Sequence, residues 1–172
     1  MAVITKNGHV DNAVRLYNKA RTMYVGLGNG KTEWSNASVP GIEDETLTEL
    51  PELVGMRLAT KVSLARPLPD GSESTSTITY AGTVYELVAV GDAYKKDAEY
   101  LYVSAVINPS DLPSGPYRSI GLFTDPTFQD GVTGDAVDAG KIISQGTLHM
   151  YENRVAFDRT NASVNEQFMI HA

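Results

Sequence analysis

The apolar residues near the amino terminus of the sequence recur with the spacing of an α-helix. Val10, Ala13, Val14 and Tyr17 fall at positions i, i+3, i+4 and i+7, which places them on one helix face. Asp11 offers a side chain that can accept a hydrogen bond from an amide of the first turn. We therefore expect a short amphipathic helix over residues 11–21 and no other long helix.

Much of the remaining chain alternates between apolar and polar residues, which is typical of half-buried β-strands. Residues 22–27 alternate before Gly28-Asn29-Gly30 breaks the pattern, and residues 57–64 alternate in the same way. Further strand candidates are Thr77–Tyr80, Thr83–Val90, Tyr100–Ile107, Arg118–Phe123, Ile142–Tyr151 and Val164–Ile170. Tyr100–Ile107 is apolar on both faces, so we expect it to be the central strand. We expect the last two candidates to form a terminal β-hairpin within residues 141–172.

Residues 31–56 interrupt this regular pattern. They contain Trp34, which is the only tryptophan, two prolines and a cluster of acids without any apolar period. Such a segment indicates a long loop or extended arm that serves a function. Together these patterns predict a mainly β fold in one structural domain over residues 1–172. We expect a sandwich or partly open barrel of about six to eight short strands, with a β core over residues 57–123.

Composition and charge exclude several classes of function. The chain has no cysteine, so disulfides, thiol nucleophiles and cysteine-ligated metals are absent. The net charge of −7 opposes binding to nucleic acid. No apolar run is long enough for a transmembrane helix, so we expect no membrane partner and synthesis in the cytoplasm. Charge is also uneven, because residues 1–32 are basic whereas Glu43, Asp44, Glu45, Glu49 and Glu52 follow without a base among them.

The segment from Gly26 to Thr32 resembles a phosphate-binding loop, but its spacing is wrong. Such a loop needs four residues between its first glycine and Gly30-Lys31, and the required position is Val25. The three histidines, His9, His149 and His171, have no metal-ligand spacing. Asp92, Asp97 and Glu99, or Glu152 and Asp158, lack the context of a catalytic acid pair. We therefore expect no enzyme, no cofactor and no metal.

Three stretches carry a resemblance to a known family. They are Ile4-Thr5-Lys6-Asn7-Gly8 before the helix, Tyr24–Gly30 in the strand that follows it, and Tyr117–Phe123 with its Ile-Gly-Leu-Phe ending. Their order and spacing are similar to those of the amino-terminal attachment domain of bacteriophage tail-collar fibres and of related baseplate-wedge proteins. The resemblance covers residues 4–123. It makes Gly26, Gly28, Gly30, Gly121, Leu122 and Phe123 the residues of the structural motif.

The resemblance implies a structural component of the phage virion, in the tail or baseplate. Its expected role is that of a baseplate or tail-fibre adaptor or wedge subunit. The expected partners are other tail or baseplate proteins, including a tail fibre, in a symmetric assembly with several copies. An alternative is a carbohydrate-binding β-sandwich module for host surface glycans, since nine tyrosines permit stacking on sugars. The expected interface residues are Trp34, Glu43, Asp44, Glu45, Arg15 and Lys19.

Overall fold

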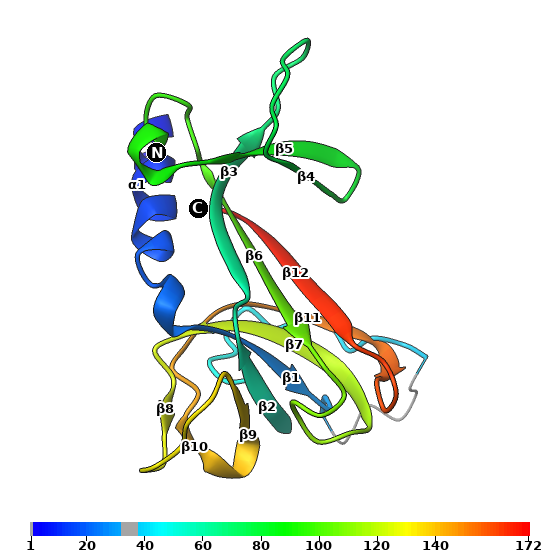
Figure 1. The fold of residues 1–172 in the computed structure, drawn as a ribbon. Helices are drawn as coiled ribbons and strands as arrows, with labels where there is room; N and C mark the ends of the chain where they lie inside the picture. Colours follow the sequence, from blue (N-terminus) through cyan, green and yellow to red (C-terminus); the bar gives the residue numbers. More distant parts are fainter. Residues whose placement is uncertain (1, 32–37) are drawn as a thin grey trace. The chain divides into compact units, whose positions relative to one another are not determined.

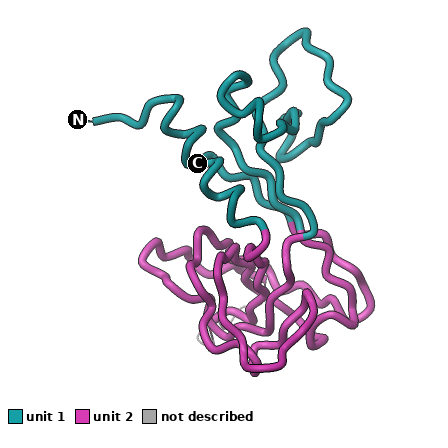
Figure 2. Tube along the Cα trace, turned by 60° about the vertical axis from the view of Figure 1, so that its left-hand side comes forward, with its two compact units in different colours: residues 1–20, 60–104, 167–172 teal, residues 21–59, 105–166 magenta. Residues whose placement is uncertain are grey.

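A computed structural model describes residues 2–31 and 38–172. The described chain is mainly β, with one amino-terminal helix and curled sheets like those of a partly open barrel, which confirms the expected fold class. Figure 1 shows the elements, and Figure 2 shows that they divide between two compact units. The single domain expected over the whole chain stays a prediction.

The first unit contains residues 1–20, 60–104 and 167–172. It carries helix α1 (Lys6–Tyr17), the 3-10 helix η2 (Val90–Asp92) and most of a five-stranded sheet. The order of that sheet is β12 (Val164–His171), β6 (Tyr100–Ile107), β3 (Lys61–Pro67), β5 (Thr83–Val88) and β4 (Thr77–Tyr80). Strand β6 is an interior strand, as its two apolar faces require, but β3 and not the predicted Tyr100–Ile107 is the central strand of the sheet.

The second unit contains residues 21–59 and 105–166. Its main sheet has the order β11 (Thr147–Asp158), β7 (Pro116–Thr124), β1 (Met23–Gly28), β2 (Leu53–Leu58) and β9 (Ala136–Asp138). Two further strands form a separate ribbon, β8 (Thr127–Phe128) and β10 (Ile142–Ser144), and the short 3-10 helices η1 and η3 span Ala20–Thr22 and Ala139–Lys141. Leu50, Met56 and Phe123 form a buried core cluster of this unit.

Helix α1 begins five residues earlier than the pattern predicts. Thr5, not Asp11, is its N-cap, because the Thr5 side chain accepts a hydrogen bond from the Gly8 amide at 3.3 Å. The helix ends at Tyr17 rather than at residue 21. Val10 and Ala13 are buried, so the predicted apolar face is confirmed even though the bounds are wrong.

The strand predicted over residues 57–64 is in fact two strands, β2 and β3. Ala59 donates its amide to the Met23 carbonyl at 2.9 Å, and Thr60 donates to the Ser104 carbonyl at 2.8 Å. The chain thus leaves one sheet and enters the other between these two residues. Since β2 begins at Leu53, the arm expected over residues 31–56 ends earlier than predicted.

The predicted terminal hairpin is wrong. Among the described strands, β11 pairs with β7, whereas β12 lies beside β6 in the other sheet. The strand expected over residues 142–151 is also divided, into β10 and β11. Gly146 causes this break, because its φ is 77° and a Cβ there would lie 2.2 Å from the Thr124 carbonyl oxygen.

Candidate interaction surfaces

The glycines of the family-like motif are packing positions in the second unit. Gly26 and Gly121 are partners across β1 and β7. A Cβ would lie 2.8 Å from Phe123 Cε2 at Gly26 and 2.9 Å from the same atom at Gly121. Gly28 is equally close-packed, since a Cβ there would lie 2.6 Å from Ser119 Oγ. The aromatic ring therefore fills the space that the two glycines leave open.

The other members of the motif are also structural in their placement. Leu122 and Phe123 are fully buried in β7, and Gly30 has a φ of 78°. This left-handed conformation favours glycine where the chain turns after β1. The amides of β1 face β2 on one side and β7 on the other, so this segment is a sheet strand rather than an open cradle for phosphate.

The segment 39–49, which we call the acidic arm, is held against β11 and β7 in the same unit. Arg118 Nη2 donates to the Val39 carbonyl at 3.0 Å, and Asn153 Nδ2 donates to the Gly41 carbonyl at 3.1 Å. The Asn153 amide donates to Glu43 Oε1 at 3.1 Å. These bonds fix the arm on both sides of residue 42.

A second anchor follows directly along the acidic arm. The Tyr151 hydroxyl donates to the Asp44 carbonyl at 3.0 Å and accepts a hydrogen bond from the Asp44 amide. The Asp44 carboxylate accepts from the side chain and the amide of Thr46, which lowers its pKa. Asp44 is therefore charged throughout the neutral range.

Ile42 is the most exposed large apolar side chain of the described residues, at 93%. Its neighbours on both sides are hydrogen-bonded to Asn153, while Glu43, Asp44 and Glu45 are all exposed. The arm therefore presents one apolar side chain in a defined place, surrounded by negative charge. An exposed apolar group that is held in this way is suited to insertion into a partner.

The remaining interface candidates lie elsewhere. Arg15 and Lys19 are exposed in the first unit, and Arg15 Nε lies 3.2 Å from Asp11 Oδ2. Trp34 lies outside the described residues. The interface roles of these residues and of the acids stay predictions.

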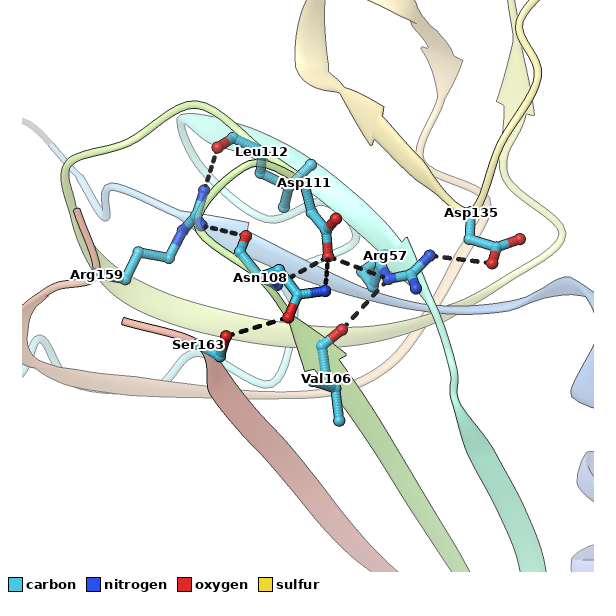
Figure 3. Close-up of polar contacts among 8 residues, drawn as sticks. All are labelled: Arg57, Val106, Asn108, Asp111, Leu112, Asp135, Arg159 and Ser163. Atoms are coloured by element: carbon cyan, nitrogen blue, oxygen red, sulfur yellow. Dashed lines mark hydrogen bonds and ion pairs between the residues drawn. The ribbon is translucent and has the colours of Figure 1, made fainter. Parts of the chain in front are cut away.

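A polar network that the sequence did not predict holds the loop before β7 (Figure 3). Arg159 is 1% exposed and donates to the carbonyls of Asn108, Leu112 and Pro113 at 3.2, 2.5 and 2.7 Å. Asp111 Oδ2 in turn accepts the Asn108 amide at 2.8 Å. The guanidinium thus organises the loop that it crosses.

The network continues to the edge of the main sheet of the second unit. Arg57 lies 3.5 Å from Asp111 and 3.2 Å from Asp135, and it also donates to the Val106 carbonyl at 3.3 Å. Ser163 Oγ donates to Asn108 Oδ1 at 3.1 Å. Only the run Asn108-Pro109-Ser110-Asp111, which has turn chemistry, gave a signal of this loop in the sequence.

A hollow of about 450 Å³ lies beside this loop. Arg118 and Arg159 line this hollow. Much of the remaining lining is apolar and comes from Leu27, Leu53, Val54, Pro113, Pro116 and Ala156. Arg118 also holds the acidic arm at Val39. The hollow and the anchored end of the arm therefore share one side chain.

A partly buried ion pair supports the carboxyl-terminal half of β11. Arg154 Nη1 lies 2.6 Å from Glu166 Oε2, and the Tyr117 hydroxyl donates to the same carboxylate. Burial and the neighbouring Glu166 raise the pKa of Tyr117, so this phenol remains a hydrogen-bond donor at physiological pH. Phe157, which is 45% exposed, packs edge-on against Tyr117, with 5.7 Å between the two ring centroids.

The histidines and acids considered for chemistry have structural surroundings. His9 and His171 stack at 4.6 Å in the first unit, and His149 Nε2 lies 2.9 Å from Thr124 Oγ1 in the second. Asp97 pairs with Lys6 at 2.8 Å and Glu99 with His171 at 3.3 Å. The acids near β11 are also engaged, Glu152 by Arg154 and Asp158 by Thr160.

The described residues contain neither a metal cluster nor a membrane-spanning helix. Within residues 2–31 and 38–172, no group of three or more histidine or acidic side chains is arranged to hold a metal ion. No helix in that part of the chain combines the length and apolar character needed to cross a membrane.

Comparison with known proteins identifies a family and a relative. The family model described as "Baseplate wedge 3 tail fiber network component" matches residues 1–171. The chain is also 32% identical over 172 residues to "Virion protein 3" of Enterococcus phage phiEF24C. That alignment covers 99% of this chain and 94% of the phage protein.

Proposed function

The chain belongs to the family of baseplate wedge 3 tail fiber network components, and on this basis we propose that it is an adaptor subunit that joins baseplate and fibre proteins. It is a structural protein of the phage virion, in the tail or baseplate. The adaptor role is geometric. It requires surfaces that bind neighbours, rather than a site where a reaction takes place.

The acidic arm is the observation that supports the proposal most directly. Ile42 is 93% exposed although the chain on both sides of it is hydrogen-bonded to Asn153. Because the segment is already ordered, a partner that covers Ile42 loses little conformational freedom of the arm. The surrounding Glu43, Asp44 and Glu45 favour a partner surface with basic side chains.

Arg15, Lys19 and Trp34 are further contact residues in this proposal. Arg15 of α1 and Lys19, which follows the helix, are exposed and suit an acidic neighbour, as the acidic arm suits a basic one. Such opposite patches guide the orientation in which subunits meet and raise the rate of their association.

Substitution of Ile42 tests the adaptor role. The variant Ile42→Ser is supplied during infection by a phage that lacks the wild-type gene, and its amount in purified tail particles is measured. Ile143→Ser is the matched control, since Ile143 is 70% exposed in β10 of the same unit. We expect both proteins to fold and melt like the wild type.

Loss of Ile42→Ser from the particles, with normal incorporation of Ile143→Ser, is the expected result. Equal incorporation of both variants would contradict the role of the arm. Specific binding of the purified protein on a glycan array would instead support the carbohydrate-binding alternative.

A further inference from the structure

Strand β4 is an edge of the sheet in the first unit, and its hairpin register defines which of its main-chain groups face outward. Ala81 and Gly82 have φ values of 47° and 82°, which is the geometry of a two-residue type I′ turn. Tyr80 and Thr83 flank this turn as partners. In such a turn the flanking residues exchange both hydrogen bonds, and the pattern then alternates along the ladder.

The alternation places the amides and carbonyls of Thr77 and Thr79 on the free side of β4. Ile78 and Tyr85 are a hydrogen-bonded pair in this alternation. Ser76 and Leu87, two residues further from the turn, are also hydrogen-bonded, since the Leu87 amide donates to the Ser76 carbonyl at 2.8 Å. Thr77 and Thr79 lie between these bonded positions. Their main-chain groups therefore point away from β5, toward a position that another strand can take.

This edge lacks the features that protect other sheet edges. Residues 74–80 contain no charged residue and no proline, and the pairing of β4 with β5 has no bulge. By contrast, the edge of β11 is covered by the acidic arm, where Glu43 accepts the Asn153 amide. β12, at the opposite edge of the same sheet as β4, carries Glu166 and His171. Charged side chains and covering segments are the usual protection against strand addition.

We propose that β4 pairs with β4 of a second copy of this chain, antiparallel, about a two-fold axis at Ile78. Thr77 of each copy then faces Thr79 of the other, and the outward amides and carbonyls of both residues form four hydrogen bonds. The two Ile78 side chains meet on one face as a non-hydrogen-bonded pair, in which Cα atoms lie about 4.5 Å apart. The inference does not depend on the adaptor role.

The second copy is the partner that this strand fits by charge. The chain carries a net charge of −7, so two copies repel each other least when they meet at an uncharged surface, where no like charges are brought into contact. Residues 74–80 supply such a surface, and a self-complementary edge is the simplest two-fold contact. A contact of four residues is small compared with the roughly 1,600 Å² of a stable interface. It is therefore weak in the free protein and becomes effective where copies are held close together in the assembly.

The absence of cysteine from the chain makes a disulfide test unambiguous. The variant Ile78→Cys is oxidised at several protein concentrations, and dimer formation is followed on non-reducing gels. Thr77→Cys is the control because Thr77 faces Thr79 of the other copy in the proposed register. The cysteines at position 77 of the two copies are then too far apart for a disulfide, which requires Cα atoms within about 7 Å.

We expect Ile78→Cys to form dimers several-fold faster than Thr77→Cys. Adding Thr79→Pro to Ile78→Cys removes an outward amide without removing a bond to β5, so it should abolish the difference. A second control, Thr79→Val, keeps the amide and should leave the dimer in place. Circular dichroism of each variant shows that the hairpin is intact.

If Ile78→Cys and Thr77→Cys form dimers at equal rates, or if Thr79→Pro does not slow dimer formation by Ile78→Cys, the disulfides arise from random collisions. Either result would overturn the proposal. Absence of dimers from Ile78→Cys both in concentrated solution and in purified tail particles would also overturn it. A disulfide between residue 78 and a different tail protein would also overturn the proposal, because that protein and not a second copy would then be the partner of β4.

Discussion

Gly26 of β1 and Gly121 of β7 lie directly opposite each other, and the ring of Phe123 occupies the space beside both. A Cβ on either residue would meet Phe123 Cε2 at less than 3 Å. Phe123 is fully buried and belongs to the core cluster of the second unit. The two glycines are thus required by the position of one aromatic ring.

Substitution of Gly121 by valine should destabilise the protein by about 1–3 kcal/mol, because the new side chain overpacks against Phe123 and Leu148. Gly140→Ala is the control, since a Cβ at Gly140 meets nothing within 4 Å and its φ is negative. Urea unfolding followed by circular dichroism measures both. An unchanged midpoint for Gly121→Val would show that Phe123 moves aside at no cost.

The strands that the sequence predicted well are those whose pattern is local. The turn Ala81-Gly82 and the alternation around it define β4 and β5, and the two apolar faces of Tyr100–Ile107 define an interior strand. In each case the information lies within about ten residues, which is the range that turn chemistry and periodicity cover. Gly121 was identified for the same reason, since a glycine inside an apolar strand suggests a close approach of neighbouring groups.

The errors concern partners that are distant in the sequence. β2 begins inside the predicted arm because its neighbours β1 and β9 come from other parts of the chain. The arm itself is held by Asn153, which is 110 residues from Glu43. The predicted terminal hairpin failed because β11 and β12 each found a partner strand from elsewhere in the chain. The alternation of apolar and polar residues within one segment does not indicate which distant strand that segment pairs with.

Arg159 offers a second test of stability. Its guanidinium is buried and donates to three carbonyls. Arg159→Lys keeps the charge but loses the planar arrangement of donors. We expect the free energy of unfolding to fall by about 2–3 kcal/mol, because a lysine cannot donate to all three carbonyls simultaneously. Exposed Arg21→Lys should be neutral. Equal stability of both variants in urea would show that the loop does not need the guanidinium fork.

The glycine-rich segment should have no affinity for nucleotides. Gly26 and Gly28 lie in β1, between β2 and β7, so their amides face neighbouring strands. A phosphate-binding loop instead directs successive amides toward the ligand. Isothermal titration of the protein with ATP and magnesium should therefore show no heat of binding. Micromolar affinity would contradict this assignment of the segment.

The Glu86 cluster in the first unit predicts how stability responds to acid. Lys96 and Arg66 hold the Glu86 carboxylate through hydrogen bonds of 2.7 Å each and lower its pKa below the ordinary value of 4.5. A carboxylate whose pKa is lower in the folded state stabilises the protein fully above the unfolded pKa. This contribution is lost as the pH falls through the lower, folded pKa.

We therefore expect the free energy of unfolding to decrease below about pH 4.5 as Glu86 becomes protonated. Glu86→Gln should weaken this dependence and destabilise the protein at neutral pH, because two cations then lose their shared carboxylate. Glu73→Gln is the control, since Glu73 is exposed in the loop before β4. Thermal melts of the three proteins between pH 3 and 7 measure the effect. If the melting temperatures of wild type and Glu86→Gln fall in parallel with pH, other carboxylates cause the acid sensitivity and the Glu86 cluster does not.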